Sequence, residues 1–328
     1  MKYLSVCSGI EAATVAWHHL GWEPVAFSDI EPFPSAVLTH HYPHVPNLGD
    51  MTKFEEWNLE SIDLLVGGTP CQSFSVAGLR QGLADPRGNL MLTYLAIAAR
   101  YRPRWIVWEN VPGVLSSNGG RDFGTFLGAL GELGYGFAYR VLDAQWFGVP
   151  QRRRRVFVVG YLGDWRHAAA VLFERESVRR NTAPSRTARQ EVAGGIEAGA
   201  RDTGQPYAIA NCLTQRMYKG INTTLDEGQT PVLTHYRKSR RAQSNTDHET
   251  WVEDEATNTL NCFDVGDIRA TDIVAATRVR RLTPLECERL QGFPDGYTNI
   301  PWRNKPEAPD GPRYKALGNS MAVPVMAW

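Results

Sequence analysis

The first part of the chain alternates short apolar runs with helix-like segments, and this alternation constrains the fold more than any other feature. Strand-like runs occupy residues 2–9, 23–30, 62–68, 105–111 and 154–162, and helix-like segments occupy 11–21, 33–42, 90–103 and 123–134. Near-continuous apolar strands that alternate with helices are typical of a parallel sheet covered on both faces. The sequence therefore predicts an α/β fold with a doubly wound, mostly parallel sheet.

Small, acidic or nucleophilic residues follow four of these predicted strands. In chain order they are Ser8 and Gly9, Asp29 and Glu31, Pro70 and Cys71, and Glu109 and Asn110. Ligands of such sheets bind beyond the carboxyl ends of the strands. Because these ends share one edge of the sheet, we expect the four groups to converge on one site.

The bulk composition indicates a globular protein without a membrane span. The chain has 328 residues, long enough for one large domain or two ordinary ones. No apolar stretch reaches the ~18 residues of a transmembrane helix, and the amino-terminal residues lack the layout of a signal peptide. We therefore expect a cytoplasmic protein. The five scattered cysteines form no C-x-x-C pair and predict neither a disulfide framework nor a metal site.

The second part of the chain has a different character. Helical periodicity fades after residue 165, and Thr, Asn, Asp, Gly and Arg become frequent. We predict a cofactor-binding catalytic domain over 1–165, completed by 311–328, and a smaller β-leaning domain over 166–310. A helix is expected from Thr283-Pro284 to Gly292. Residues 150–190 hold ten arginines and three carboxylates, a basic run that either faces phosphates or is simply solvated.

The first strand exit favours a nucleoside cofactor without a pyrophosphate. The sequence "SVCSGIEAA" lacks the G-x-G-x-x-G pattern, and the chain has no Gly-Lys pair for a P-loop. Asp29, about 20 residues after this loop, stands where a carboxylate binds a ribose in doubly wound sheets. S-Adenosylmethionine fits these features. Asp50 is a candidate for the adenine amino group, or simply a turn or helix cap.

Cys71 and Glu109 are the candidate reactive groups. Pro70 and the preceding glycines hold the Cys71 thiol stiffly at a strand exit, although a lone cysteine is also a common core residue. No histidine stands at a partner position, so the thiol needs an electrophile polarised by a neighbouring acid. Glu109 is that acid if it binds a ring nitrogen and amino group; the alternative is a salt bridge, for instance to Arg104.

Six motifs, in order, resemble those of the C5-cytosine DNA methyltransferases. They are "CSGIEAATVAW" with "SDIEPF" and "GDM", "GGTPCQSFS", "WENV", "QRRRRVFVVG", "RLTPLECERLQGFPD" and "ALGNS". The likeness covers roughly residues 1–160 and 278–328. It implies that a cytosine is flipped out of duplex DNA, that Cys71 adds to its C6, and that Glu109 binds N3 and N4. S-Adenosylmethionine then methylates C5.

The resemblance also implies further site residues. Arg153 is expected near the O2 of the base. Supporting roles fall to Gln72, Asn110, Val111, Gln151 and Arg155, while Arg152 and Arg154 are expected to be solvated. The cofactor site is expected to include Ser8, Gly9, Ile10, Asp29, Glu31, Asp50, Met51, Pro70, Leu90, Asn319 and Ser320. Residues 72–89 are predicted to close over DNA, an ordinary surface loop being the alternative.

Three features depart from the family or fall outside its motifs. The family often has Phe-x-Gly-x-Gly-Gly, whereas here Cys7 replaces the aromatic residue and Glu11-Ala12 the later glycines. Residues 166 to about 277 occupy the place of the target-recognition domain, and Arg237, Lys238, Arg240 and Arg241 are candidates for DNA contact. The chain also ends within the last motif, so a short further stretch is expected.

The sequence thus predicts a DNA (cytosine-5)-methyltransferase of a restriction–modification or host-protection type. Its partner is double-stranded DNA, with no membrane and no metal. A monomer is expected, and a restriction endonuclease of the same system is a candidate partner. Two alternatives stay open: a tRNA cytosine-5 methyltransferase, and a catalytically silent DNA-binding relative.

Overall fold

The computed structural model describes residues 1–70, 90–173 and 282–328, together with five short strands between residues 230 and 280. The short strands are β7 (Thr230–Val232), β8 (His235–Arg240), β9 (Thr250–Asp254), β10 (Asp272–Ile273) and β11 (Arg278–Arg280). β8 pairs with β9 and β10, and β7 pairs with β11, all antiparallel. These pairings agree with the predicted β-leaning character of this part.

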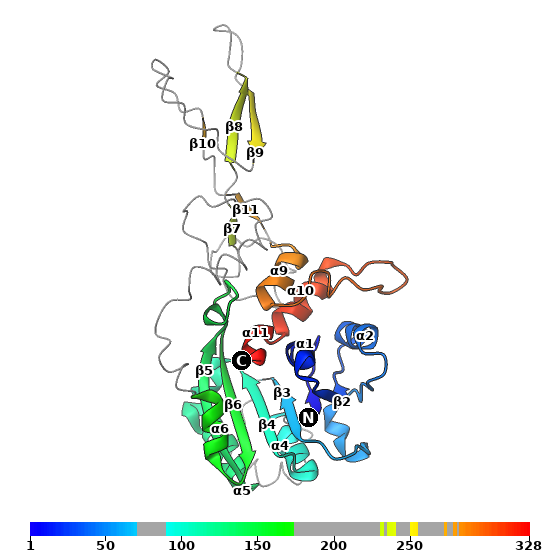
Figure 1. The fold of residues 1–328 in the computed structure, drawn as a ribbon, viewed down its shortest axis with the longest axis vertical. Helices are drawn as coiled ribbons and strands as arrows, with labels where there is room; N and C mark the ends of the chain where they lie inside the picture. Colours follow the sequence, from blue (N-terminus) through cyan, green and yellow to red (C-terminus); the bar gives the residue numbers. More distant parts are fainter. Residues whose placement is uncertain are drawn as a thin grey trace.

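The centre of the fold is a six-stranded sheet with the order β2-β1-β3-β4-β6-β5 (Figure 1). Its strands are β1 (Lys2–Val6), β2 (Glu23–Ser28), β3 (Leu64–Gly67), β4 (Trp105–Asn110), β5 (Tyr135–Asp143) and β6 (Arg154–Leu162). The first four strands are parallel, and β6 runs antiparallel to both β4 and β5. The predicted doubly wound, mostly parallel sheet is confirmed.

One strand of this sheet, β5, was not expected from the sequence. Its segment follows a helix ending in glycine, and it contains Gly136, which weakens a strand pattern. The structure explains this glycine: a Cβ at Gly136 would lie 2.2 Å from the backbone nitrogen of Trp165. The close passage of the next helix over the strand therefore requires a residue without a side chain.

Helices cover both faces of the sheet (Figure 1). They are α1 (Ala12–Trp17), α2 (Pro32–His41), α4 (Leu90–Tyr101), α5 (Arg121–Glu132), α6 (Trp165–Leu172), α9 (Pro284–Gln291), α10 (Asp310–Asn319) and α11 (Val323–Ala327). Short 3₁₀ turns are η1 (His18–Leu20), η2 (Met51–Glu56), η4 (Pro112–Leu115), η5 (Ser117–Gly120) and η6 (Ala144–Trp146). The helix predicted over 11–21 is thus shorter and tightens into η1 before Gly21.

Successive strand residues enter two separate hydrophobic cores, as the period of two in a strand requires. Tyr3 and Leu64 pack on one face with α1, α2, α6 and the carboxyl-terminal helices. Leu4 and Leu65 pack on the other face with η2, α4 and α5. Burial on both faces explains why these strands read as continuous apolar runs rather than alternating ones.

The helix predicted between Thr283 and Gly292 is confirmed as α9. Thr283 accepts a hydrogen bond from the backbone of Glu286, whose carboxylate accepts one from the backbone of Thr283, which completes a capping box. Gly292 ends the helix with a φ of +79°. Side chains from Leu282 to Ala308 join the core around α1, so the chain after residue 281 belongs to the body formed by the first 173 residues.

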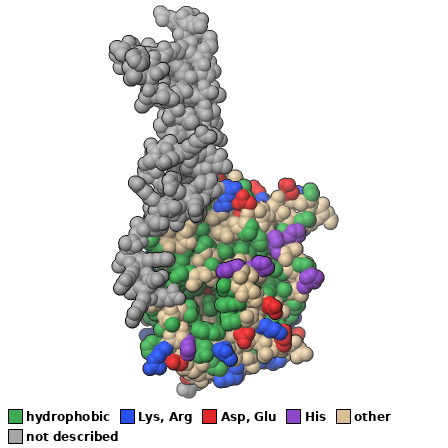
Figure 2. Space-filling model, viewed as in Figure 1, with side chains coloured by type: hydrophobic (Ala, Val, Ile, Leu, Met, Phe, Trp, Pro, Cys, Tyr) green, Lys and Arg blue, Asp and Glu red, His purple; other side chains and the backbone are tan. Residues whose placement is uncertain are grey.

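No helix in the described part of the chain is long and apolar enough to cross a membrane. On the face that Figure 2 shows, hydrophobic side chains gather in the middle, and charged side chains of both signs lie toward its upper and lower margins. This face is therefore not a uniformly basic surface.

Candidate functional site

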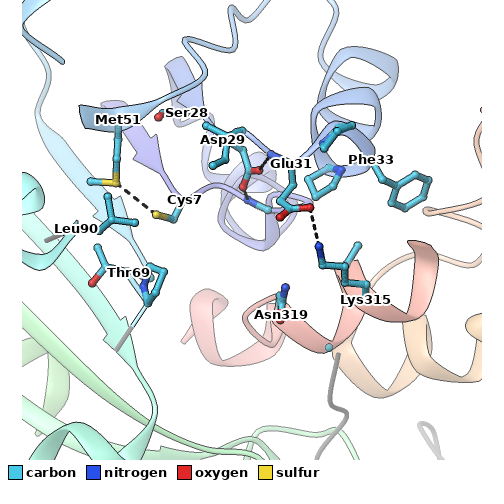
Figure 3. A pocket seen from close by; sticks show the side chains of 18 of the residues that line it. Cys7, Ser28, Asp29, Glu31, Phe33, Met51, Thr69, Leu90, Lys315 and Asn319 are labelled. Atoms are coloured by element: carbon cyan, nitrogen blue, oxygen red, sulfur yellow. Dashed lines mark hydrogen bonds and ion pairs between the residues drawn. The ribbon is translucent and has the colours of Figure 1, made fainter. Parts of the chain in front are cut away.

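The carboxyl ends of β1 to β4 open into a cavity of about 840 Å³. Its wall comes from the loops after these strands, from the start of β6, and from α10 on the carboxyl-terminal side (Figure 3). Pockets of this size are ordinary for small-molecule ligands and cofactors. The four strand exits singled out in the sequence do meet at one site, at the edge where ligands of doubly wound sheets bind.

Glu109 lies near the end of β4 and is 9% exposed. Its Oε1 lies 3.1 Å from Nε of Arg155 on the neighbouring strand β6. Burial raises the pKa of Glu109 above its usual value, and the nearby charges of Arg155 and Arg153 oppose this rise. The salt bridge considered from the sequence therefore exists, but its partner is Arg155 and not Arg104. Both residues line the large cavity.

The four consecutive arginines divide into two kinds. Arg152 and Arg154 are exposed, whereas Arg153 and Arg155 turn inward. Arg153 is 3% exposed and donates to the carbonyl oxygens of Ser320 at 2.6 Å and Gly318 at 3.2 Å.

Arg153 therefore connects β6 to the end of α10 at the cavity wall. Gln151 is fully buried and donates to the carbonyl oxygen of Leu290 on α9.

The segment after β3 is fixed by residues of β4. The Asn110 side chain donates to the carbonyl oxygen of Thr69 at 2.9 Å, and the Trp108 indole donates to the Thr69 hydroxyl at 3.0 Å. Asn110 also accepts from the backbone N–H of Val111 at 2.8 Å. These bonds anchor Pro70 at the rim of the cavity. Cys71 and Gln72, the predicted nucleophile and its neighbour, lie outside the described residues, as does the loop to residue 89.

Asp29 links the loops after β1 and β2. Its Oδ2 accepts from the backbone N–H of Gly9 at 2.8 Å, and its Oδ1 accepts from that of Glu31 at 2.8 Å. Burial raises the pKa of Asp29, and the two backbone hydrogen bonds oppose this rise. The Ser8 hydroxyl donates to the carbonyl oxygen of Ser5 at 2.9 Å. The predicted ribose-binding carboxylate therefore also holds the loop that surrounds it.

Asp50 caps a turn and lines the cavity as well. Its Oδ1 accepts from the backbone N–H and the hydroxyl of Thr52 at 2.9 and 2.8 Å. The capping alternative considered from the sequence is therefore present, and the adenine contact stays a prediction for a residue that also lines the cavity. Met51 follows it, with its sulfur 3.4 Å from that of Cys7 (Figure 3).

Most of the predicted cofactor residues line the large cavity. These are Gly9, Asp29, Glu31, Asp50, Met51, Pro70, Leu90 and Asn319. Ser8 and Ser320 instead line a smaller adjoining cavity of about 40 Å³. Ile10 lines neither cavity, since its side chain is fully buried in the hydrophobic core. The individual binding roles of all these residues remain predictions.

The structure adds two residues that the sequence reasoning did not assign to the site. Lys315 on α10 forms an ion pair of 2.7 Å with Glu31 across the cavity (Figure 3). Lys315 precedes Asn319 by four residues, so a helix over "RYKALGNS" would have placed both on one face. Glu11 is 1% exposed behind the loop after β1. The sequence feature that could have identified it as a site residue is that it replaces a glycine of the family motif.

The candidate DNA-contacting residues are described only in part. Arg237, Lys238 and Arg240 belong to β8, opposite β9, and Arg241 lies outside the described residues. Among the described residues, no cluster of three or more His, Cys, Asp or Glu side chains is placed to hold a metal ion.

The fold and its carboxylate-lined cavity define the Rossmann-like class of S-adenosylmethionine-dependent methyltransferases. The family model for the C-5 cytosine-specific DNA methylases matches residues 1–327. The chain therefore belongs to this family, whose members take their methyl group from S-adenosylmethionine.

Three individual proteins illustrate the relationship. A protein of Escherichia phage P1 named DNA N-6-adenine-methyltransferase is 38% identical over 99% of this chain and 60% of its own length. The Type II methyltransferase M.BsuFI of Bacillus subtilis is 34% identical over 99% of this chain and 70% of its own length. The crystal structure of S. pombe Dnmt2 has the same fold, with a TM-score of 0.63 at 20% identity, covering 100% of this chain and 96% of that one. The chain thus spans only 60% of the phage P1 relative.

The residues around the cavity suit the family's cofactor. A nucleoside needs a carboxylate for its ribose and close backbone approach at the first strand exit. Asp29 and Gly9 meet these needs, and the left-handed Gly9, with a φ of +57°, has open space where a Cβ would stand. Asp29, Glu31 and Glu109 also give the cavity carboxylates, which favour a cationic ligand such as a sulfonium.

Proposed function

We propose that this protein methylates C5 of cytosine in duplex DNA, using S-adenosylmethionine and a covalent intermediate on Cys71. The observation that carries the proposal is Glu109, buried beside Arg155 and Arg153 at the cavity edge next to the anchored Pro70. A buried carboxyl of raised pKa is able to hold a proton and bind a ring nitrogen, which is the role that cytosine chemistry requires.

The target cytosine has to leave the base stack, because its C5 and C6 atoms are inaccessible within the duplex. In the cavity, Glu109 binds N3 and the N4 amino group. Its proton on N3 withdraws electron density from C6. The thiolate of Cys71 then adds to C6. The electron pair of the C5–C6 double bond moves to C5, where it is conjugated through C4 with the protonated N3. Arg155 holds the Glu109 carboxyl in place, and Arg153 lies beside it for the O2 of the base.

When bound, S-adenosylmethionine supplies an electrophilic methyl group to C5, whose electron pair the addition has made available. Loss of the C5 proton to solvent returns an electron pair to the ring. The C6–S bond then breaks and N3 returns its proton to Glu109, which restores the C5–C6 double bond, the Cys71 thiolate and the Glu109 acid. Asn110 holds the backbone of Thr69, which precedes Pro70 and Cys71 in the chain.

We propose that the residues between 174 and 281 form the target-recognition domain, with the basic residues of β8 among those that contact DNA. The predicted division at residues 165 and 310 remains untested. The packing of Leu282, Cys287 and Phe293 in the core favours a return to the catalytic body at about residue 282. We also propose that the protein is a monomer and resides in the bacterial cytoplasm. A restriction endonuclease of the same restriction–modification system is the proposed partner.

The phage P1 relative suggests a second substrate, because its name refers to the N6 of adenine. Methylation of an exocyclic amine needs no thiol adduct, so Cys71 would then have no chemical role. The cysteine in the Pro-Cys-Gln sequence and the buried Glu109 therefore favour cytosine. A tRNA substrate is the other alternative, and a silent DNA-binding relative the third.

One experiment separates these possibilities. The full chain is incubated with S-adenosylmethionine and either plasmid DNA or tRNA, and the nucleosides are assayed for 5-methylcytosine and N6-methyladenine. We expect 5-methylcytosine in DNA. Methylation confined to adenine or to tRNA would refute the proposal, and absence of any methylation under saturating cofactor would favour the silent relative.

The covalent step is tested with a duplex that carries 5-fluorocytosine, because fluorine at C5 cannot leave as a proton and the adduct persists. We expect an adduct with the wild type and none with Cys71→Ser, while DNA binding survives. Cys287→Ala is the matched control, because Cys287 is buried in the core away from the cavity. An equal adduct yield from Cys71→Ser would overturn the assignment of the nucleophile.

A further inference from the structure

Glu11 adopts a backbone conformation that glutamate rarely takes. It immediately precedes α1 with a φ of +66° and a ψ of +61°, in the left-handed region that favours glycine. A non-glycine residue held there costs on the order of 1 kcal/mol or more and marks a functional constraint more often than chance would. The side chain is 1% exposed. The chain therefore maintains a buried acid where glycine would fit with less strain.

The Glu11 carboxyl has few partners. Its Oε1 accepts a long hydrogen bond of 3.3 Å from the backbone N–H of Thr14. Its Oε2 is buried without a hydrogen-bond partner in the described part of the chain. Burial raises the pKa of Glu11 to about 7, although the hydroxyls of Ser5 and Thr14 oppose the rise. An unpartnered buried carboxylate is costly, so a positive charge nearby would stabilise it strongly.

No cation among the described residues supplies that charge. The titratable groups that interact with Glu11 from the elements packed around it are Tyr3, Asp29, Tyr42 and Tyr297. All four are acids, and Asp29 raises the pKa of Glu11 further. Among the described residues, no Lys, Arg or His forms an ion pair with Glu11. The described residues therefore offer Glu11 no counter-charge, and its carboxyl favours the protonated, neutral form until a cation comes near.

Glu11 lies beside the cofactor cavity. It lines the small cavity of about 40 Å³, together with residues that also line the large one. The shared residues are Cys7, Gly9, Gly68, Glu109 and Asn319. The two cavities therefore adjoin, and the buried carboxyl stands behind the loop that the cofactor is expected to contact. Charges in such a water-poor setting interact over several ångströms with little screening.

We propose that Glu11 is the electrostatic partner of the sulfonium of S-adenosylmethionine and makes the site prefer the charged methyl donor over its neutral product. The inference rests on the proposed function, since it assumes this cofactor. S-Adenosylmethionine carries a positive charge on sulfur that S-adenosylhomocysteine lacks, while the adenosine and amino-acid ends are the same. The electric field of the Glu11 carboxylate thus favours binding of the donor over the product. The weaker affinity for the product helps it to dissociate after methyl transfer.

Proton linkage gives this role a measurable signature. A cation beside Glu11 favours the ionised carboxylate, so binding of the methyl donor lowers the pKa of Glu11 and releases a proton. Near pH 7 this release is a measurable fraction of one proton. The preference for donor over product therefore increases as the pH rises through about 7. Asp29 and Glu109 also face the cavity, and a variant at Glu11 leaves their contributions in place.

The test is calorimetric titration of the full chain with S-adenosylmethionine and with S-adenosylhomocysteine, in buffers of different ionisation enthalpy. We compare wild type with Glu11→Gln. In the wild type we expect extra proton release with the donor, and a donor-to-product affinity ratio that rises about three- to tenfold between about pH 6 and pH 8. In Glu11→Gln the extra release disappears and the rise in the ratio is lost.

Each other outcome has a defined meaning. If Glu11→Gln retains the wild-type proton release and ratio, or if the wild type shows no difference between the ligands, Glu11 is not the sulfonium partner. If the wild type binds neither ligand, the proposed cofactor fails and this inference fails with it. Glu11→Gly, which relieves the left-handed strain, serves as a second variant should Glu11→Gln not fold, and it is expected to lose the same signature.

Discussion

Two buried glutamates border the same cavity, but they differ in the charged groups around them. Glu109 ends a strand with its carboxylate 3.1 Å from Arg155 and with Arg153 nearby. Glu11 follows β1, which β3 separates from β4. One of its carboxyl oxygens has no hydrogen-bond partner in the described residues, and the nearby Asp29 carboxylate raises its pKa further. Both carboxyls have a raised pKa because of burial. Among the described residues, cations of the protein offset that burial for Glu109 but not for Glu11.

The difference teaches that burial alone does not define a role for an acid. Arginines beside Glu109 fix its orientation and limit the rise of its pKa, as a group that meets a substrate ring requires. The carboxyl of Glu11 lacks such partners, so its charge depends on what enters the adjoining cavity. Glu109 thus has cationic neighbours among the described residues, whereas the partner proposed for Glu11 is the cationic methyl donor.

The largest effect is expected from Glu109→Gln. Glutamine keeps the shape and can still meet the N4 amino group, but it cannot transfer a proton to N3. We expect kcat for DNA methylation to fall by about 10²- to 10⁴-fold, the range of a lost general acid, while DNA binding changes little. Single-turnover methylation and a binding titration measure the two quantities. A kcat within about threefold of wild type would remove Glu109 from the mechanism.

The next largest effect concerns stability at Glu11. Its pKa is about 7 in the folded protein against 4.5 in a free side chain, so the folded state binds more protons between these values. Stability from this group is therefore full below about pH 4.5 and is lost as the pH rises through about 7. The total change is on the order of 3 kcal/mol, from 1.36 kcal/mol per pKa unit.

Glu11→Gln removes this dependence. Its unfolding free energy relative to wild type should rise by up to that amount between about pH 5 and pH 8. Urea denaturation at both pH values measures it, with the exposed Glu55→Gln as control. A pH-independent difference between Glu11→Gln and wild type would show that Glu11 is already ionised, or already paired, in the free protein.

The same contrast explains what the sequence could and could not predict. Glu109, Asp29 and Pro70 were found because parallel strands place their ends at one edge, and this follows from apolar periodicity alone. The partner of Glu109 was misjudged, because choosing Arg155 over Arg104 depends on β6 running antiparallel beside β4. Strand β5 was not predicted because Gly136 weakens a strand pattern. This glycine is required by the close approach of the Trp165 backbone, a contact that strand propensity does not reveal. The pairing of β6 with β4 and the close approach of Trp165 to Gly136 are set by the tertiary structure, so local sequence patterns do not predict them.

Glu11 shows the limit more sharply. The sequence revealed that it replaces a family glycine, but its left-handed φ, its burial and its unpartnered oxygen appear only in three dimensions. Ile10 shows a further limit. It sits in the cofactor motif and its side chain enters the hydrophobic core, so the predicted contact with the cofactor would have to come from its backbone.

A smaller effect is expected at Arg155. Its charge lowers the pKa of Glu109, so Arg155→Met should let that pKa rise further and shift the Glu109-dependent limb of the pH–kcat profile to higher pH. We expect about a tenfold loss of kcat, with partial recovery in Arg155→Lys, which restores the charge without the planar fork. Arg154→Met is the matched control, because its side chain is exposed. An unshifted profile would mean that the ion pair does not tune Glu109.

The smallest effect belongs to the ion pair between Glu31 and Lys315. The two side chains are 48% and 43% exposed, and exposed pairs contribute about 0.2–1 kcal/mol. A double-mutant cycle with Glu31→Gln and Lys315→Met, read as affinity for S-adenosylhomocysteine, should give a coupling in that range that fades in high salt. The contribution of Glu11 to donor preference should persist in the same salt, because its carboxyl is buried. Equal salt sensitivity of the two would mean that water reaches Glu11, and the contrast between a solvated and a buried acid at this cavity would be lost.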